Sequence, residues 1–198
     1  MKSKSVILCL IAILTFSTTL FAQIDSSLYD RVFEESEGLI RVKKDGKYGF
    51  VDPTGEVVIP FRYSAARNFG SWRAAVKTDS LWGFVNPQGQ EVVPPVYDRV
   101  WAYSEGLALV RRKGRYGYIN LSGVPVIQLQ YDQAQSVSEG MAMVCKSGKC
   151  GYHDATGRLV IPLIYDEAWP FVNGKAQVRK DGKWMYIDAA GQCVEDCE

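Results

Sequence analysis

Apolar and polar residues follow one another in short runs, and turn residues interrupt these runs every six to eight positions. Between residues 97 and 130, for example, Lys113-Gly114 separates the apolar run 107–110 from the apolar run 116–119. The runs are rich in β-branched and aromatic residues, as is typical of short strands bounded by turns. No window is long enough for a pair of amphipathic helices. The pattern therefore predicts an all-β chain.

The same pattern returns every 34 residues from Tyr29 onwards. A glycine between two aromatic or similar residues marks most copies, with methionine in the last: Gly49, Gly83, Gly117, Gly151 and Met185. The period equals that of tetratricopeptide repeats, but the closely spaced turn signals exclude helix pairs. We predict five tandem β-meander repeats, which cover residues 29–62, 63–96, 97–130, 131–164 and 165–198.

Each unit is predicted to contain three short strands. In the third unit these are residues 106–112, 115–120 and 124–127. A two-residue turn such as Asp45-Gly46 joins the first strand to the second, and Asp-Gly is a strong hairpin signal. An Asx-x-x-Gly turn such as 52–55 follows, because the Asx side chain bonds its own backbone. The third strand usually ends at proline, and a Tyr-Asp connector leads to the next unit.

The last unit differs from the other four. Met185 replaces the strand glycine, and residues 192–196 replace the usual Val-Ile-Pro segment with a more polar one. We expect the inner glycines to make room for a ring of the neighbouring unit. Terminal units of open arrays are commonly polar and atypical. The sequence therefore favours an open solenoid-like array, with a small β-propeller as the alternative.

The repeated core resembles the WG repeat family. Its residues include Glu105-Gly106-Leu107-Ala108 upstream of the aromatic-Gly dipeptide and Val-Ile-Pro-x-x-Tyr-Asp downstream of it. Trp82-Gly83 matches the namesake dipeptide, whereas Tyr48, Tyr116 and Cys150 depart from its tryptophan. The resemblance covers residues 29–198 and implies a β-rich binding or structural scaffold without a general catalytic site.

The first 28 residues indicate export. Residues 1–22 combine Lys2 and Lys4 with an apolar run, as a signal peptide does, and residues 23–28 form a short polar leader. No later segment is apolar enough to be expected to cross a bilayer. Without Lys2 and Lys4 the chain carries 21 basic and 22 acidic residues, a net charge of −1, which does not favour nucleic-acid binding. We expect a periplasmic, outer-envelope or extracellular location.

Four cysteines remain after signal cleavage: Cys145, Cys150, Cys193 and Cys197. An even number in an exported chain indicates two disulfides, with three possible connectivities. A two-residue turn at Ser147-Gly148 would place Cys145 opposite Cys150 in a non-hydrogen-bonded pair, so we predict that these two are joined. Cys193 and Cys197 can pair only if a turn lies between them.

The residues offer little catalytic chemistry. His153 is the single histidine and occupies a strand position that is otherwise apolar, which favours a packing role. The Asx turns supply one carboxylate or amide each, too few for calcium, and two of the five are asparagine. We find no phosphate loop, zinc spacing or nucleophile elbow. The sequence therefore predicts no catalytic residue, cofactor or metal.

Basic residues recur at the first hairpin of each unit and would align as a ridge if the units stack. The members of this predicted basic ridge are Lys43, Lys44, Lys47, Arg111, Arg112, Arg115, Lys146, Lys149, Arg179, Lys180 and Lys183. We expect the acidic residues to concentrate elsewhere. The ridge could attract an anionic polymer or surface, but lysines at hairpin ends also keep strand edges soluble. Trp101 and Trp169 share one repeat position and form a candidate aromatic platform.

These features favour an exported, non-enzymatic repeat scaffold that binds a protein or glycan partner. A purely structural envelope protein is the alternative. A hydrolase is a weaker one, because the chain has no recognisable site for it. A tryptophan-lined groove would favour a glycan, and a broad apolar face would favour a protein.

Overall fold

The computed structural model describes residues 24–197. The predicted signal peptide, residues 1–22, therefore lies outside the described residues. The leader contains one 3-10 helix, η1 (Ser26–Leu28), whose first turn is capped by Asp25: the carboxylate accepts a hydrogen bond from the backbone N–H of Ser27 at 3.0 Å. From residue 30 to residue 197 the described chain consists of strands, turns and short irregular segments.

Five four-stranded antiparallel sheets follow one another along the chain. The first contains β1 (Arg31–Ser36), β2 (Leu39–Lys44), β3 (Lys47–Val51) and β4 (Val57–Tyr63). The second contains β5 (Ala65–Ala66), β6 (Ala74–Thr78), β7 (Leu81–Val85) and β8 (Glu91–Tyr97). The third contains β9 (Arg99–Ser104), β10 (Leu107–Arg112), β11 (Arg115–Asn120) and β12 (Pro125–Tyr131). The fourth contains β13 (Gln133–Ala134), β14 (Met141–Lys146), β15 (Lys149–Asp154) and β16 (Leu159–Tyr165). The fifth contains β17 (Glu167–Ala168), β18 (Ala176–Lys180), β19 (Lys183–Ile187) and β20 (Cys193–Glu195).

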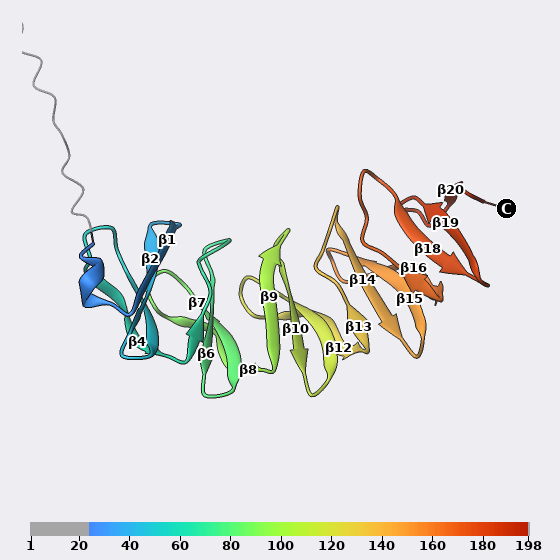
Figure 1. Ribbon diagram of the computed structural model, residues 1–198. Helices are drawn as coiled ribbons and strands as arrows, with labels where there is room; N and C mark the ends of the chain where they lie inside the picture. The colour runs from blue at the N-terminus through green and yellow to red at the C-terminus, as the bar shows by residue number, and fades with distance from the viewer. Residues whose placement is uncertain (1–23, 198) are drawn as a thin grey trace, which may run out of the picture.

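The sheets form an open row. Figure 1 shows them one after another in a gentle curve, with the first and the fifth at opposite ends. The prediction of an all-β, open array of five repeats is confirmed, and a small β-propeller does not form. Each of the first four sheets ends at the tyrosine that opens the next 34-residue period of the sequence, as Tyr63 closes β4.

The prediction of three strands per unit was wrong, because the connector also pairs. In the third unit β9 lies beside β10, with Val100 opposite Val110. The last strand also continues past the proline position instead of ending there, so Pro60 lies inside β4. This strand is the outer edge of its sheet, where a residue without an N–H group removes no ladder hydrogen bond. Local pairing signals alone could not reveal either extension.

The strand glycines face backbone of their own sheet, not a ring of the neighbouring unit as we had expected. A Cβ atom added at Gly117 would lie 2.6 Å from the carbonyl oxygen of Ile127 in β12. The adjacent strand thus passes close over the glycine, where the register between β11 and β12 shifts. Met185 can occupy this position in the fifth sheet because β20 is short and its last residue, Glu195, pairs with Tyr186.

Apolar side chains pack between consecutive sheets. At the junction of the fourth and fifth units Tyr152 and Ile161 contact a cluster that includes Phe171 and Val178. The rings of Tyr152 and Phe171 meet edge to face, with centroids 5.0 Å apart. Fully burying a large apolar side chain contributes about 1.5–3 kcal/mol, so the packing at these junctions is strongly stabilising.

Polar contacts also join consecutive units. The carboxylate of Glu105 accepts hydrogen bonds from the backbone N–H groups of Glu139 at 2.9 Å and Gly140 at 2.6 Å. Glu139 in turn accepts from the N–H groups of Asn173 at 2.6 Å and Gly174 at 2.8 Å. We call this contact the glutamate clamp. It joins the turn before β10 to the turn before β14, and the turn before β14 to the turn before β18.

The outer face of the fifth unit is polar. Glu195 takes the place that Ile161 holds in the fourth unit, and Lys175 takes the place of Met141. These two charged residues form an ion pair, and the Lys175 ammonium lies 4.4 Å from the ring centre of Tyr186. No described sheet packs on this face, and polar residues on such an end face keep it soluble.

Candidate functional site

The predicted basic ridge does follow one edge of the array. The turns after β2, β6, β10, β14 and β18 all lie along the lower edge in Figure 1. The acidic residues, however, do not concentrate elsewhere, and that expectation was wrong. Asp132 pairs with Arg115 and also accepts the N–H of Ser147 at 2.8 Å. Asp166 pairs with Lys149 at 2.6 Å and accepts the N–H of Asp181 at 3.0 Å.

These connector aspartates interleave with the basic tips because the connector runs back along the hairpin of the following unit. The Lys149 ammonium, which donates a hydrogen bond to Asp166, lowers the pKa of that carboxyl below its ordinary value. The edge is therefore a mixture of both charges. The ridge residues that remain near it are Lys44, Lys47, Arg112, Arg115, Lys146, Lys149, Lys180 and Lys183.

The other ridge residues lie over aromatic rings of the neighbouring strand. The Arg111 guanidinium is 5.5 Å from the ring centre of Tyr116, its cross-strand partner. The equivalent pairs are Lys43 over Tyr48 at 5.7 Å, Lys77 over Trp82 at 5.9 Å and Arg179 over Trp184 at 5.7 Å. Such contacts are favourable cation–π interactions. We call this repeated feature the cation–aromatic pair.

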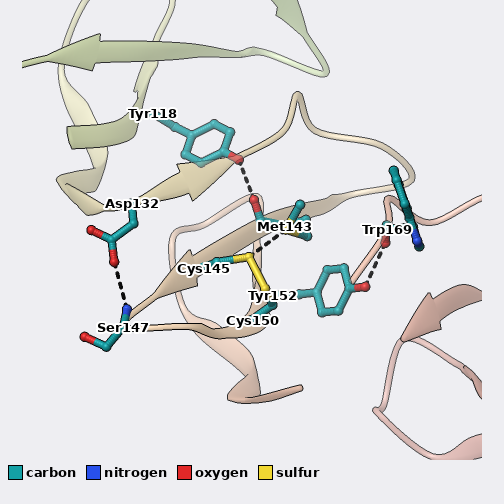
Figure 2. Close-up of a disulfide and its surroundings, with 8 residues drawn as sticks. All are labelled: Tyr118, Asp132, Met143, Cys145, Ser147, Cys150, Tyr152 and Trp169. Carbon is teal, nitrogen blue, oxygen red and sulfur yellow. Dashed lines mark hydrogen bonds between the residues drawn. A yellow bond between two sulfur atoms is a disulfide. The ribbon is translucent and has the colours of Figure 1, made fainter. Parts of the chain in front are cut away.

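The fourth unit has a disulfide where the other units have this pair. Cys145 lies opposite Cys150, and their Cα atoms are 4.0 Å apart across the bond (Figure 2). The carbonyl of Cys145 accepts the N–H of Asp132 at 2.9 Å, so its polar backbone groups point away from β15. The two cysteines therefore form a non-hydrogen-bonded pair, the closer of the two antiparallel arrangements. This is the pairing that the hairpin register indicated.

The smaller disulfide leaves a groove at the junction of the fourth and fifth units. Its volume is about 360 Å³, near the lower end of the range for small-molecule sites. The disulfide and Met143 line it from the fourth unit, and Ala168 lines it from the fifth. The polar lining consists of Gln133, Gln135, Asp132, Asp166 and Glu167. Sequence reasoning missed this groove, although aligning the cysteines with the cation–aromatic pairs would have indicated it.

Each carboxylate that lines the groove has a cationic partner. Asp132 pairs with Arg115, and Asp166 pairs with Lys149. Glu167 pairs with Arg179. The groove is polar at its margin, yet it carries no surplus of either charge.

The two tryptophans of the candidate platform differ in environment. Trp101 is half-buried and packs against Tyr116, with ring centres 5.8 Å apart. Trp169 is 49% exposed and is among the residues that line the groove. Its carbonyl accepts a hydrogen bond from the hydroxyl of Tyr152 at 2.7 Å (Figure 2). Only Trp169 is open enough to meet a ligand.

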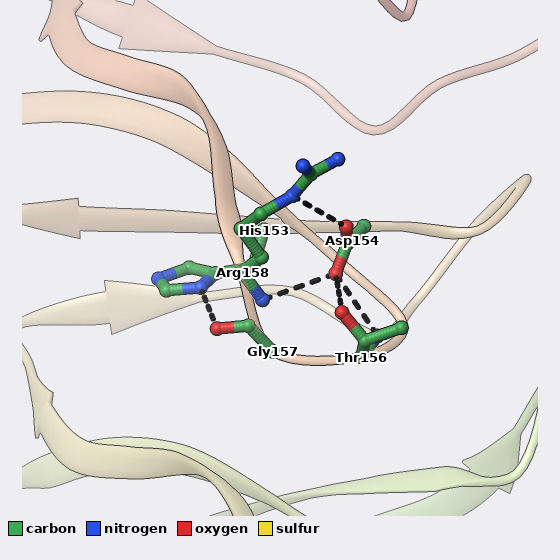
Figure 3. Close-up of polar contacts among 5 residues, drawn as sticks. All are labelled: His153, Asp154, Thr156, Gly157 and Arg158. Atoms are coloured by element: carbon green, nitrogen blue, oxygen red, sulfur yellow. Dashed lines mark hydrogen bonds and ion pairs between the residues drawn. The ribbon is translucent and has the colours of Figure 1, made fainter.

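His153 has both ring nitrogens engaged. Its Nδ1 lies 2.8 Å from the carbonyl oxygen of Gly157 (Figure 3), and its Nε2 lies 2.6 Å from the Tyr131 hydroxyl. A carbonyl oxygen can only accept, so Nδ1 carries the proton and Nε2 accepts from the tyrosine. The histidine thus joins β12 of the third sheet to β15 of the fourth.

The Asx turns have the geometry that the sequence suggested. The Asp154 carboxylate accepts the N–H groups of Thr156 and Arg158, each at 3.0 Å (Figure 3). The Thr156 hydroxyl also donates to it, and this bond is the main cause of the lowered pKa of Asp154. Among residues 24–197, no group of three or more His, Cys, Asp or Glu side chains has an arrangement that could hold a metal ion.

The second disulfide joins Cys193 to Cys197, whose Cα atoms are 5.7 Å apart. Asp196 has a φ of +57°, so the chain turns between the two cysteines, as their pairing requires. This turn carries the chain away from β19 after Glu195.

A family model described as WG containing repeat matches five consecutive segments of the chain: residues 27–48, 48–82, 82–116, 116–150 and 151–184. The chain belongs to the WG repeat family. Its glycine core, cation–aromatic pairs and glutamate clamps are therefore features of a WG repeat array. No curated protein sequence matches the chain.

One solved structure of low sequence identity supports the β fold. A structure of a eukaryotic initiation factor is 14% identical, with a TM-score of 0.51, over 86% of this chain and 55% of that one. Hsv2 of Kluyveromyces lactis is 9% identical, with a TM-score of 0.46, over 80% of this chain and 60% of that one. The WG repeat chain thus spans less than two thirds of either neighbour. Within the described residues, no helix has the length and apolar character needed to cross a membrane.

Proposed function

We propose that this WG repeat protein is an exported, non-enzymatic scaffold that binds a protein or glycan partner. The observation that carries the proposal is the groove between the fourth and fifth units. Four units fill the equivalent position with a cation–aromatic pair, whereas the fourth has the smaller Cys145–Cys150 disulfide. A recess at a position that the other units fill gives a defined place for a ligand.

The side-chain chemistry supports binding without catalysis. Both nitrogens of His153 are engaged, one with Tyr131 of the preceding sheet and the other with the carbonyl of Gly157 in its own sheet. The carboxylates at the groove are held by cations, and the lowered pKa of Asp166 opposes a role as a proton donor near neutral pH. General acid catalysis needs the opposite shift, towards the working pH.

The two disulfides support export. Disulfides form and persist in oxidising compartments outside the cytoplasm and are rare inside it. Both bonds close short loops, with sequence separations of five and four positions. Together with the expected signal peptide, they favour the periplasm, the outer envelope or the extracellular space.

Affinity capture from cell-envelope extract of the source organism tests the proposal. The oxidised protein is compared with Gln135→Trp, which introduces at the groove the residue that unit three has as Trp101 and leaves the disulfide intact. Trp72→Ala is the matched control, because Trp72 is 61% exposed and lies outside the groove lining. We expect a partner to be retained by the wild type and the control but not by Gln135→Trp. Equal recovery by all three proteins would contradict a role for the groove.

A further inference from the structure

We infer that the groove between the fourth and fifth units binds a neutral sugar ring of a glycan chain. The inference rests on the proposed scaffold function and names its ligand class. Three properties of the groove lead to it: an apolar floor, a hydrogen-bonding margin and the absence of net charge.

The floor suits the carbon-bound hydrogens of a pyranose. The Cys145–Cys150 disulfide, Met143 and Ala168 are buried and face the recess. Trp169 stands at the margin and is half exposed, so its indole is available beside a ligand. Apolar and aromatic surface of this kind contributes affinity by removing C–H groups from water.

The margin suits hydroxyl groups. The Gln133 and Gln135 side chains are exposed at the groove and can each donate and accept. The carboxylates of Asp132, Asp166 and Glu167 accept only. A sugar hydroxyl both donates and accepts, so it can satisfy either kind of group. A purely apolar ligand would leave these polar groups without partners, which is costly once water is excluded.

The charge pattern disfavours ionic ligands. An anion would approach three carboxylates, and a cation would compete with Arg115, Lys149 and Arg179, which already neutralise them. A neutral polar ligand meets neither obstacle. This distinguishes the groove from the basic ridge, whose predicted ligand was an anionic polymer or surface.

Calorimetric titration of the oxidised protein tests the inference. The probes are the neutral oligosaccharides maltohexaose, cellohexaose and N-acetylchitohexaose, and the acidic polymer polygalacturonate, each at low and at high salt. We expect at least one neutral oligosaccharide to bind, with an affinity that salt leaves unchanged, since screening acts on charged partners. Binding only to polygalacturonate, binding weakened by salt, or no binding to any neutral probe would overturn the inference.

Two variants that fill the groove locate the binding. Gln135→Trp keeps the disulfide, and Cys145→Arg with Cys150→Tyr restores the pair that unit three has at Arg111 and Tyr116. Both should weaken sugar binding at least tenfold, as should Trp169→Ala, since removal of an aromatic contact commonly has such an effect. Trp72→Ala should bind as the wild type does. Unchanged binding by both filled variants would show that the sugar does not bind in the groove, which would overturn the inference.

The two proposals can fail separately. If Gln135→Trp abolishes capture of a protein partner while no sugar binds, the scaffold function stands and the sugar inference is overturned. If sugars bind in the groove, the inference and the scaffold function are both supported. If neither capture nor titration depends on the groove, both proposals fall.

Discussion

The first four sheets and the fifth sheet have nearly the same hairpin but different outer strands. In the first four sheets the last strand has seven residues and crosses close over a glycine, as β12 crosses Gly117. In the fifth sheet β20 has three residues, and Met185 occupies the glycine position. The face beyond β19 also carries an ion pair in place of apolar residues. The comparison teaches that each unit's sequence reflects whether another unit follows it.

The outer strands differ in length because a following sheet buries the last strand of each of the first four sheets. Where a neighbour follows, the last strand must extend to the tyrosine that packs at the junction, so it needs the path over the glycine. Tyr165 has this role between the fourth and fifth units and is buried. Without a neighbour the strand gains nothing by extending, and polar residues at the end are favourable.

The largest expected effect comes from filling the glycine position. Gly117→Val should lower the free energy of unfolding by about 3 kcal/mol or more, because the new Cβ meets the backbone carbonyl of Ile127, which cannot move aside like a side chain. Met185→Val is the matched change in the fifth sheet and should cost less than about 1.5 kcal/mol. Chemical denaturation of both variants measures the difference. Similar losses at the two sites would break the distinction between inner and terminal sheets.

The two disulfides should also differ. Loop-entropy arguments assign about 2 kcal/mol to a loop of this size. Cys145→Ala with Cys150→Ala should lose at least that amount, because the bond lies in the core of a junction. Cys193→Ala with Cys197→Ala should lose less, since both cysteines are exposed at the end of the array. Thermal unfolding of the two double variants, with wild type as reference, checks the order, and a larger loss at the terminal disulfide would contradict it.

The glutamate clamp predicts a smaller contrast. Glu139→Ala removes a carboxylate that accepts two backbone N–H groups of the next unit and should cost about 1–2 kcal/mol. Asn173 occupies the same position in the fifth unit, where no sheet follows, so Asn173→Ala should change stability by about 0.5 kcal/mol or less. Urea denaturation measures the loss in free energy of unfolding for each variant. The two losses can be compared directly when the m-values are equal. Equal losses would show that the clamp does not depend on a neighbour.

The smallest effect concerns the Asx turns and appears only in acid. The pKa of Asp154 is lowered, mainly by the hydrogen bond from Thr156, so its ionised form contributes stability above the unfolded-state pKa of about 3.9. That contribution is lost as pH falls through the lower folded-state pKa. Asp154→Asn, which copies Asn86 and Asn120 of other units, should leave stability near pH 7 almost unchanged and reduce the acid loss. Melting temperatures measured from pH 7 to pH 2 test this, and parallel curves for the two proteins would refute it.

Local patterns predicted the features that depend on residues close in sequence. The turn at Ser147-Gly148 sets the register of its hairpin, and this register placed Cys145 opposite Cys150. The Asx turns depend on a side chain and the backbone two and four residues later, as at Asp154. The polar last unit indicated an end without a neighbour. The hairpin and the Asx turns involve residues only a few positions apart, so the order of residues was enough to predict them.

Other predictions failed because their partners lie in a strand or unit that local signals do not identify. The glycine's neighbour is a carbonyl of the adjacent strand, and the fourth strand exists only because the connector pairs with the next hairpin. The basic tips are neutralised by aspartates that the chain brings back to them. Nothing in the local pattern specifies these approaches.

The repeat, the hairpin register, the turns and the polar last unit could be read from the order of residues, because each follows from periodicity or from short-range backbone chemistry. Which side chains share a junction depends on how the units stack. The groove exists because stacking places the disulfide of one unit against Ala168 and Trp169 of the next. Its neutrality follows from ion pairs such as Lys149 with Asp166, whose members are 17 residues apart. Shape and charge at a junction depend on how two units pack, and packing is a property of the folded chain.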